Sequence, residues 1–270
     1  MSKTVLVTGS SSGIGRATVE AFAEAGWKVA ATSRNPKKEN FKGLTNVATY
    51  KLDVTDSTSI DKAFQEVLKQ HKKIDAVVNN AGYGLNGIFE AMNEAQIKKQ
   101  FETNVFGLMN VTRAAITSMR PNKGGTIIQI SSMGGRVTFP LYSVYHSSKW
   151  AVEGFSESLQ YELKQFGIRI KIIEPGSIKT DFYGRSRTFV KPESSMGYDG
   201  FVSKVESVSQ RSGKSGEDPR LVARTILKAA NDSSNKLRYP VGSPAPVLLQ
   251  ARKLLPERLF YFVIKRIYKV

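Results

Sequence analysis

Short apolar runs alternate with helix-like stretches throughout the first 180 residues of this 270-residue chain. Each run is short enough to be a buried strand, and the stretches between them repeat apolar residues at helical spacing. Strict alternation of this kind builds βαβ units, whose parallel strands form a sheet covered by helices on both faces. The sequence therefore predicts a doubly wound α/β fold. The predicted strands cover residues 5–7, 28–32, 50–52, 76–78, 126–130 and 169–173.

The pattern predicts one Rossmann-type domain over residues 1–243, followed by a helical extension over residues 244–270. Within the domain, residues 183–217 are rich in serine and show little periodicity, which predicts a mobile region beside the substrate. A helix is expected to resume near Pro219, and residues 239–242 are expected to form a short edge strand and turn. The C-terminal extension carries two amphipathic helical patterns, which we expect to pack on the domain.

The composition excludes several kinds of site. The chain has no cysteine, so disulfides, thiolate catalysis and cysteine-type zinc sites are excluded. Its two histidines, His71 and His146, are too far apart in sequence to suggest a metal motif, and no metal is expected. No stretch approaches the roughly 20 apolar residues that span a bilayer. The first strand also begins too early for a signal peptide, and together these observations predict a cytoplasmic protein.

A net charge of +17 and a pI near 9.9 favour anionic ligands such as phosphorylated cofactors or acidic membranes. The chain has no run of five or six basic residues, so specific nucleic-acid binding is not expected. In the C-terminal extension, Leu259, Phe260 and Phe262 alternate with cations, which suggests peripheral membrane contact. The alternative is a helix that packs on the domain or shields the substrate cleft. The cations are Arg252, Lys253, Arg258, Lys265, Arg266 and Lys269.

A glycine-rich turn follows the first predicted strand and opens the first helix. Its glycines let the backbone approach a pyrophosphate, and the helix N-terminus offers free N–H groups and a partial positive charge. The spacing Gly-x3-Gly-x-Gly differs from the common Gly-x-Gly-x-x-Gly fingerprint, so a tight turn without a ligand is the alternative. The residues expected to contact the cofactor here are Gly9, Ser11, Ser12, Gly13, Ile14 and Gly15.

The end of the second strand, Ser33-Arg34, bears on cofactor selectivity. Dinucleotide-binding folds commonly place a carboxylate here to hold the ribose 2′-hydroxyl. This chain instead has a guanidinium, which can bind a 2′-phosphate in a fork. NADP(H) is therefore the expected cofactor, with NAD(H) as the alternative. The competing interpretation of Arg34 is an ordinary solvated arginine.

The ends of later strands offer further cofactor contacts. Asp53-Val54 ends the third strand, where the carboxylate could accept a hydrogen bond from the adenine amino group. A loop or cap acid before the next helix, at residues 57–69, is an almost equally good interpretation of Asp53. The fourth strand ends in Asn79, Asn80, Ala81 and Gly82, and the last three are expected to lie against the cofactor ribose.

A phenol and an ammonium, Tyr145 and Lys149, lie four residues apart in a stretch with helical spacing and so share one helix face. A nearby ammonium favours the phenolate, which tunes a tyrosine toward acid–base catalysis. Ser132, just after the strand at 126–130, offers a hydroxyl that could polarise a substrate carbonyl. Each signal is weak by itself, but together they predict a carbonyl–alcohol oxidoreductase.

These motifs occur in the order and spacing of the classical short-chain dehydrogenases/reductases, which the chain resembles over residues 3–182. The stretches at 104–107 and 145–150 resemble the 17β-hydroxysteroid-dehydrogenase-like subgroup. The resemblance implies a homo-oligomer, a dimer or tetramer, formed through helices at 107–119 and 150–166. The motifs that carry it are the glycine turn from Thr8, Asn79-Asn80-Ala81-Gly82, Asn104, Ser132, Tyr145-x3-Lys149 and Pro175-Gly176.

The resemblance also implies roles for individual residues. Tyr145 would be the acid/base, Lys149 would lower its pKa and bind the nicotinamide ribose, and Ser132 would orient the substrate oxygen. Asn104 would hold a water that links Lys149 to solvent. Glu174 departs from the small or neutral residue common in the family and is interpreted as lying at the surface or behind the contact residues. The residues implied along the nicotinamide are Pro175, Gly176, Ile178 and Thr180.

The expected function is NADP(H)-dependent interconversion of a carbonyl and an alcohol. The substrate pocket is expected from residues 83–89, 134–142 and 183–217, and it is expected to be apolar. His146 is interpreted as a helix residue beside the site rather than a second acid. The alternative function is a non-catalytic dinucleotide sensor or scaffold on the same fold. The residues that suggest an apolar pocket are Val137, Phe139, Leu141 and Phe182.

Overall fold

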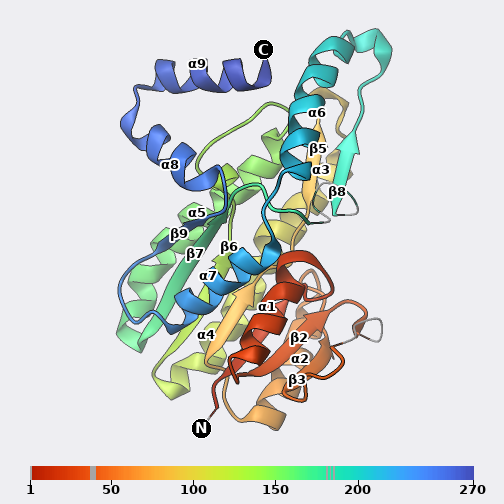
Figure 1. Ribbon diagram of the computed structural model, residues 1–270. Coiled ribbons are helices and arrows are strands. Elements are labelled where there is room, and N and C mark those ends of the chain that lie inside the picture. The colour runs from red at the N-terminus through yellow and green to blue at the C-terminus, as the bar shows by residue number, and fades with distance from the viewer. Residues whose placement is uncertain (1, 37–40, 181, 183, 185) are drawn as a thin grey trace.

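The computed structural model describes residues 2–36, 41–180, 182, 184 and 186–270. In this part of the chain, seven parallel strands form one sheet in the order β3-β2-β1-β4-β6-β7-β9 (Figure 1). This order confirms the predicted doubly wound Rossmann-type fold. The strands are β1 (Thr4–Thr8), β2 (Lys28–Ser33), β3 (Val47–Lys51), β4 (Ala76–Asn79), β6 (Gly125–Ile130), β7 (Ile168–Pro175) and β9 (Arg238–Val241).

Alternation along the strands fixes the two layers of helices. Successive strand residues point to opposite faces, so in β1 Val5 and Val7 pack against one layer and Leu6 packs against the other. The central strand is therefore apolar at every core position, as expected for a parallel sheet that is buried on both sides. The first layer contains α1 (Gly13–Glu24) and α7 (Pro219–Asn231). The second contains α2 (Ser57–His71), α4 (Leu108–Met119) and α5 (Ser143–Leu163).

The strand order reverses between β1 and β4, because the chain moves outward in one direction through β2 and β3 and in the other through β6 and β7. Connections leave this point toward opposite faces, which opens a crevice at the carboxyl ends of the two strands. The glycine turn after β1 and the Asn80 segment after β4 meet there. The fold thus brings together motifs that lie 70 residues apart.

A third cluster lies at the carboxyl end of the sheet, where α6, α8 and α9 gather at the top of Figure 1. Phe260, Ile264 and Tyr268 of α9 are buried against Val137 and Leu141. The C-terminal helices are therefore packed on the domain through one face. The elements here are α6 (Asp199–Lys214), α8 (Ala245–Leu254), α9 (Glu257–Tyr268) and a two-stranded parallel sheet of β5 (Gly84–Gly87) and β8 (Arg187–Val190).

The structure differs from the sequence analysis in the segment 183–217. The analysis found little periodicity, but α6 is a 16-residue helix whose few apolar residues, such as Val202 and Val205, follow helical spacing. Its serines obscured the pattern, and one of them, Ser209, is buried and paired with the hydroxyl of Tyr142. Tyr183, which begins the predicted segment, lies outside the described residues. The mobility of the segment stays a prediction.

Candidate functional site

A cavity of about 1220 Å³ opens at the switch point of the sheet. The structure brings into its lining every residue that the sequence analysis assigned to the dinucleotide. These residues are Gly9, Ser11, Ser12, Gly13, Ile14, Gly15, Ser33, Arg34, Asp53, Val54, Asn80, Ala81, Gly82, Tyr145, Lys149, Pro175, Gly176, Ile178 and Thr180.

The glycine turn is held by a side chain from the neighbouring strand. Asn80 donates from Nδ2 to the carbonyl oxygens of Thr8 and Gly9 at 2.9 and 3.0 Å. A Cβ on Gly15 would lie 2.1 Å from the oxygen of Gly9 and 2.5 Å from Asn80 Nδ2. Only glycine therefore lets the start of α1 pack this closely against the turn.

The first turn of α1 is suited to an anion. The N-cap residue Ser12 makes no side-chain capping bond in the described structure, and the first turn contains no acidic residue. Early N–H groups of a helix have no intrahelical acceptors, so they are available to a ligand oxygen. Because this helix end lines the cavity, the residues present fit a pyrophosphate.

The far end of the cavity carries polar groups from β2 and the loop after β3. Ser33 is buried, and its hydroxyl has no hydrogen-bond partner among the described residues, whereas Arg34 beside it is exposed. Asp53 uses Oδ1 to accept from the backbone N–H and the hydroxyl of Thr55, at 3.0 and 2.8 Å. The loop role considered for Asp53 is therefore present, and the residue also lines the cavity. The unpaired Ser33 hydroxyl fits a polar ligand at this end.

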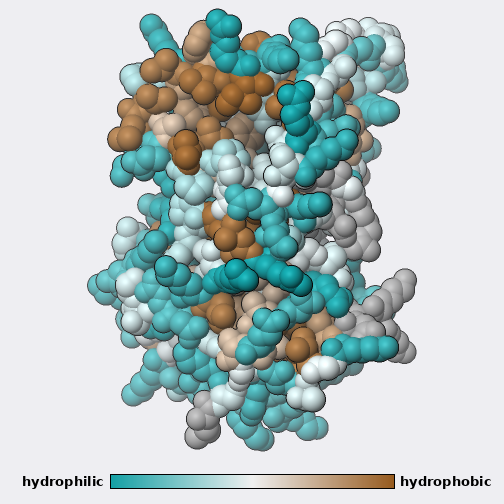
Figure 2. Space-filling view, viewed as in Figure 1, coloured by the Kyte–Doolittle hydropathy of each residue, from teal (hydrophilic) through white to brown (hydrophobic). Residues whose placement is uncertain are grey.

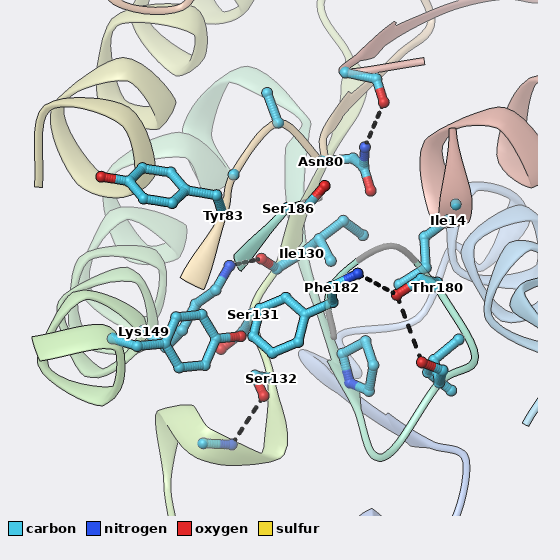
Figure 3. A pocket seen from close by; sticks show the side chains of 18 of the residues that line it. Ile14, Asn80, Tyr83, Ile130, Ser131, Ser132, Lys149, Thr180, Phe182 and Ser186 are labelled. Atoms are coloured by element: carbon cyan, nitrogen blue, oxygen red, sulfur yellow. Dashed lines mark hydrogen bonds between the residues drawn. The ribbon is translucent and has the colours of Figure 1, made fainter. Parts of the chain in front are cut away.

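The predicted catalytic residues Ser132, Tyr145 and Lys149 line the opposite part of the cavity. Lys149 donates from Nζ to the carbonyl of Ile130 at 2.8 Å, and Figure 3 shows this bond with Ser132 and Phe182 nearby. The phenol ring of Tyr145 lies 5.2 Å from the ring of Phe182, measured between centroids. Burial lowers the pKa of Lys149 to about 8, and the negative charge of Glu153 opposes that shift.

Asn104 is the exception, because it is buried behind the cavity instead of in its lining. It lies in a π-helical segment (Glu102–Gly107) between α3 (Glu94–Phe101) and α4. Its amide donates to the carbonyl of Tyr83 at 2.9 Å and accepts from the Tyr83 N–H at 3.1 Å. The same Nδ2 lies 3.4 Å from the hydroxyl of Ser148. Asn104 thus fixes the loop after β4 next to the site, and its relay role stays a prediction.

His146 neighbours Tyr145 in the cavity wall. Its Nδ1 accepts from the N–H of Phe139 at 3.3 Å, so Nε2 carries the proton. Burial lowers the pKa of His146 to about 3, which makes it neutral at physiological pH and unsuited to act as a second acid. Among the described residues, no cluster of three or more metal-ligating side chains could hold a metal ion.

One of the two interpretations of Glu174, a position at the surface, is wrong. The sequence analysis placed it at the surface or behind the contact residues, and the structure buries it completely. It accepts a hydrogen bond from Arg136 at 3.3 Å. Burial, reinforced by the nearby charge of Glu153, raises the pKa of Glu174 to about 7. Glu174 lies in β7, and the alternation along this strand points its side chain inward. The surface interpretation considered only the charge of the residue and not its place in a strand.

The rest of the cavity wall is largely apolar. Phe139 and Phe182 line it as predicted, whereas Val137 and Leu141 pack behind it in the core. The sequence analysis missed the direct contribution of the C-terminal helices, although it weighed a shielding role for them. Their amphipathic spacing was the available signal. The additional lining residues include Tyr142, Val208, Ser209, Ser212, Leu248, Ile267 and Tyr268.

Comparisons with known proteins agree with this geometry. A family model described as short chain dehydrogenase matches residues 3–190. An uncharacterized oxidoreductase of Bacillus subtilis, YusZ, is 38% identical over 98% of this chain and 98% of its own length. A 3-ketodihydrosphingosine reductase of Bacteroides thetaiotaomicron is 31% identical, again over 98% of both chains.

Solved structures give the same result. A short-chain dehydrogenase from Streptomyces avermitilis superposes with a TM-score of 0.83 at 34% identity, covering 94% of this chain and 92% of that one. ElxO with NADP bound has a TM-score of 0.73 at 29% identity, covering 89% and 98%. A tyrosine-to-phenylalanine variant of ElxO with NADPH bound has a TM-score of 0.72 at 28% identity, with the same coverage.

The close packing at Gly15 generates a prediction. Gly15→Ala forces a methyl group against the Gly9 carbonyl, and overpacking of this kind costs about 1–3 kcal/mol. If this cost falls on the bound form of the turn, we expect dinucleotide affinity to fall by roughly 5- to 150-fold, since 1.4 kcal/mol corresponds to a factor of ten. Fluorescence titration with NADPH and NADH measures the affinity, and circular dichroism checks folding.

Gly154→Ala is the matched control, because a Cβ at this position in α5 would meet no atom within 4 Å. It should bind the dinucleotide as the parent does and melt no lower, since alanine favours a helix. Unchanged dinucleotide affinity in folded Gly15→Ala would contradict the pyrophosphate site.

Proposed function

Because this chain belongs to the short-chain dehydrogenase family, we propose that it is an NADP(H)-dependent oxidoreductase that interconverts a carbonyl and an alcohol on an apolar substrate. The observation that carries the proposal is the single cavity that joins the glycine turn and Arg34 to Ser132, Tyr145 and Lys149. The relative named 3-ketodihydrosphingosine reductase acts, by its name, on a ketone. Membership of the 17β-hydroxysteroid-dehydrogenase-like subgroup stays a prediction.

The cofactor supplies or receives the hydride when bound, and the chain supplies the proton. In the reductive direction Tyr145 donates its phenolic proton to the carbonyl oxygen, and the Lys149 ammonium stabilises the phenolate left behind. The Ser132 hydroxyl donates to the same oxygen as negative charge develops. At present this hydroxyl accepts from the N–H of Gly134 at 3.0 Å, which leaves its own proton available and fixes its position. No metal is required for these steps.

Substitution of the acid/base tests the proposal most simply. Tyr145→Phe should reduce NADPH-dependent carbonyl reduction by roughly 10²–10⁴-fold, the usual contribution of a positioned acid. Binding of NADPH should persist, as it does in the tyrosine-to-phenylalanine variant of ElxO. Turnover is measured by NADPH absorbance against a panel of ketones and aldehydes, and affinity by fluorescence.

The matched control is Tyr142→Phe, which removes a hydroxyl in the same cavity that already pairs with Ser209. It should lose far less turnover than Tyr145→Phe. Substantial activity in Tyr145→Phe would refute the acid/base role. Wild-type protein that binds NADPH but reduces no carbonyl would favour the alternative, a non-catalytic sensor.

Arg34 supports the preference for NADP(H), because its guanidinium lines the cavity beside the unpaired Ser33 hydroxyl at the end where the adenosine ribose would lie. NADP-bound neighbours are consistent with this preference. Arg34→Asp should lower the selectivity for NADPH over NADH by about 10- to 100-fold, as expected for losing hydrogen bonds between charged groups. The ratio of kcat/KM values for the two cofactors measures it.

Lys51→Asp is the control for the change in charge. Lys51 is paired in register with Ser33 on the adjacent strand but does not line the cavity. Its selectivity should stay close to that of the parent. An equal change in cofactor selectivity in the two variants would mean that Arg34 acts only through the overall charge of the surface and not through a direct contact with the 2′-phosphate.

The outer face of the C-terminal helices supports a second role, contact with an anionic membrane. Apolar residues including Val247, Leu254, Leu259 and Phe262 are exposed there, and Figure 2 shows apolar surface gathered at the top of the molecule. Residues 245–270 carry six cations and one acid, Glu257. An apolar face flanked by cations suits an anionic lipid surface. In the described part of the chain, no helix is long and apolar enough to cross a membrane.

Vesicle binding tests this role. The protein should sediment with phosphatidylglycerol-containing vesicles at low salt, less so at high salt, and little with phosphatidylcholine alone. Phe262→Asp, at a side chain that is 53% exposed, should weaken binding at least about tenfold, because it removes a residue whose burial is worth about 1.5–3 kcal/mol. Leu221→Asp, on α7 outside the C-terminal helices, should bind as the parent does. Equal binding by both variants would contradict the role.

Self-association also stays a proposal. Phe106, Trp150 and Tyr161 expose aromatic surface near α4 and on α5, the helices implied for oligomer contacts by the family resemblance. This surface supports a homo-oligomer. A cytoplasmic location likewise stays a prediction.

A further inference from the structure

A group of buried charges lies directly behind the proposed catalytic lysine. Glu153 is one helical turn after Lys149 on α5, and its side chain is 6% exposed. Glu174 is fully buried on β7 and lies close enough to Glu153 for the charge of Glu153 to add to the effect of burial and raise the pKa of Glu174. Arg238 contacts both carboxylates, and Arg136 contacts Glu174. The charged groups that face Glu153 are Lys149 and Glu157 on α5, Arg136 after β6, Glu174 on β7 and Arg238 on β9.

The contacts join three parts of the site. Arg238 donates from Nε to Glu153 at 3.0 Å and lies 4.0 Å from Glu174. Arg136, in the loop that begins with Ser132, donates to Glu174 at 3.3 Å. Glu174 directly precedes Pro175, where the chain enters the predicted nicotinamide segment. The loop, the catalytic helix and this strand end therefore share one charge cluster.

Backbone packing brings the loop after β6 close to the part of α5 that carries Lys149 and Glu153, which share one helix face at positions i and i+4. A Cβ on Gly135 would lie 2.9 Å from Cγ of Glu153, 3.2 Å from the carbonyl oxygen of Lys149 and 2.6 Å from the hydroxyl of Ser131. Ser131 lines the cavity. Only a glycine permits this approach between the loop and α5. Burial raises the pKa of Glu153, and the hydrogen bond and charge of Arg238 lower it against that rise, which favours the ionised carboxylate.

Isolated buried charges are unfavourable, so Lys149 needs a partner to remain an ammonium. Its hydrogen bond to the neutral carbonyl of Ile130 does not provide a negative charge. We propose that Glu153 is a positioning residue whose buried carboxylate, anchored by Arg238 and backed by Glu174, keeps Lys149 protonated for catalysis. The inference rests on the proposed function. In that function Glu153, Glu174 and Arg238 have no role so far.

The effect on pH dependence has a definite sign. Burial lowers the pKa of Lys149 to about 8, and the charge of Glu153 raises it against that trend. Without the carboxylate, the pKa of Lys149 must fall further, so the lysine loses its proton at a lower pH. Carbonyl reduction needs the ammonium to stabilise the phenolate of Tyr145. The alkaline limb of the pH profile should therefore move to lower pH.

The test compares Glu153→Gln with Glu157→Gln across pH 6 to about 10, since this range includes the pKa of an ordinary lysine. Glu157 shares Arg238 with Glu153 but is 51% exposed, which makes it a matched control. The alkaline limb of kcat/KM should move down by about one pH unit in Glu153→Gln, as expected for losing a nearby opposite charge. It should stay in place in Glu157→Gln. Circular dichroism and NADPH affinity verify folding.

Two results would overturn the inference. One is a uniform loss of activity in Glu153→Gln with an unmoved limb, which is the outcome of a merely structural role. The other is an equal shift in both variants. If Glu153→Gln does not fold, Glu153→Met replaces it, because this change also removes the carboxylate and keeps a side chain of similar length. An unmoved limb there also refutes the inference. Failure of the proposed function is distinct, since wild-type protein would then reduce no carbonyl.

Discussion

Lys149 carries its ammonium into the interior of the protein and binds it to the carbonyl of Ile130, at the carboxyl end of a central strand. This bond connects α5 to the edge of the sheet where the crevice opens. Tyr145 lies one helical turn before Lys149, and Ser132 lies two residues after Ile130. The bond therefore fixes the position of Tyr145 relative to Ser132. The proposed chemistry depends on that alignment, and burial of the charge has to be compensated by the surroundings.

The two ends of the cavity solve different physical problems. At the dinucleotide end, the backbone provides the binding groups, because glycines and an uncapped helix N-terminus expose N–H groups where a phosphate would lie. At the substrate end, aromatic and aliphatic side chains from α6, α8 and α9 close the wall. Polar groups are few and convergent there, a pattern typical of a small-molecule site. The geometry of the sheet joins the two ends without a separate domain.

Much of this arrangement could be predicted from the sequence. The inner positions of β1, Val5 to Val7, are all apolar, and the glycine turn follows β1 directly, so the sheet and the dinucleotide-facing edge follow from local patterns. Apart from Tyr145 and Lys149 on α5, the residues assigned to the dinucleotide come from five strand ends, and parallel strands place those ends at one edge. The parallel topology therefore predicts that these residues, although far apart in sequence, lie close together in space.

Other features depend on tertiary packing that no local pattern records. The helix α6 has few apolar residues among many serines, so few positions in its sequence reveal the helical period. Glu174 is charged, yet it points inward because its position in β7 alternates toward the core, where Arg136 and Arg238 meet it. The sheet of β5 and β8 pairs segments about 100 residues apart. No local pattern in the sequence indicates that these two segments pair.

The most direct measurement is a crystal structure of the protein with NADPH and an unreactive ketone analogue. The account predicts the pyrophosphate at the start of α1, and the nicotinamide between Ile178 and Tyr145. It also predicts the ketone oxygen within hydrogen-bond distance of the hydroxyls of Tyr145 and Ser132. A dinucleotide bound elsewhere, or a Tyr145 hydroxyl turned away from the reduced ring, would contradict it.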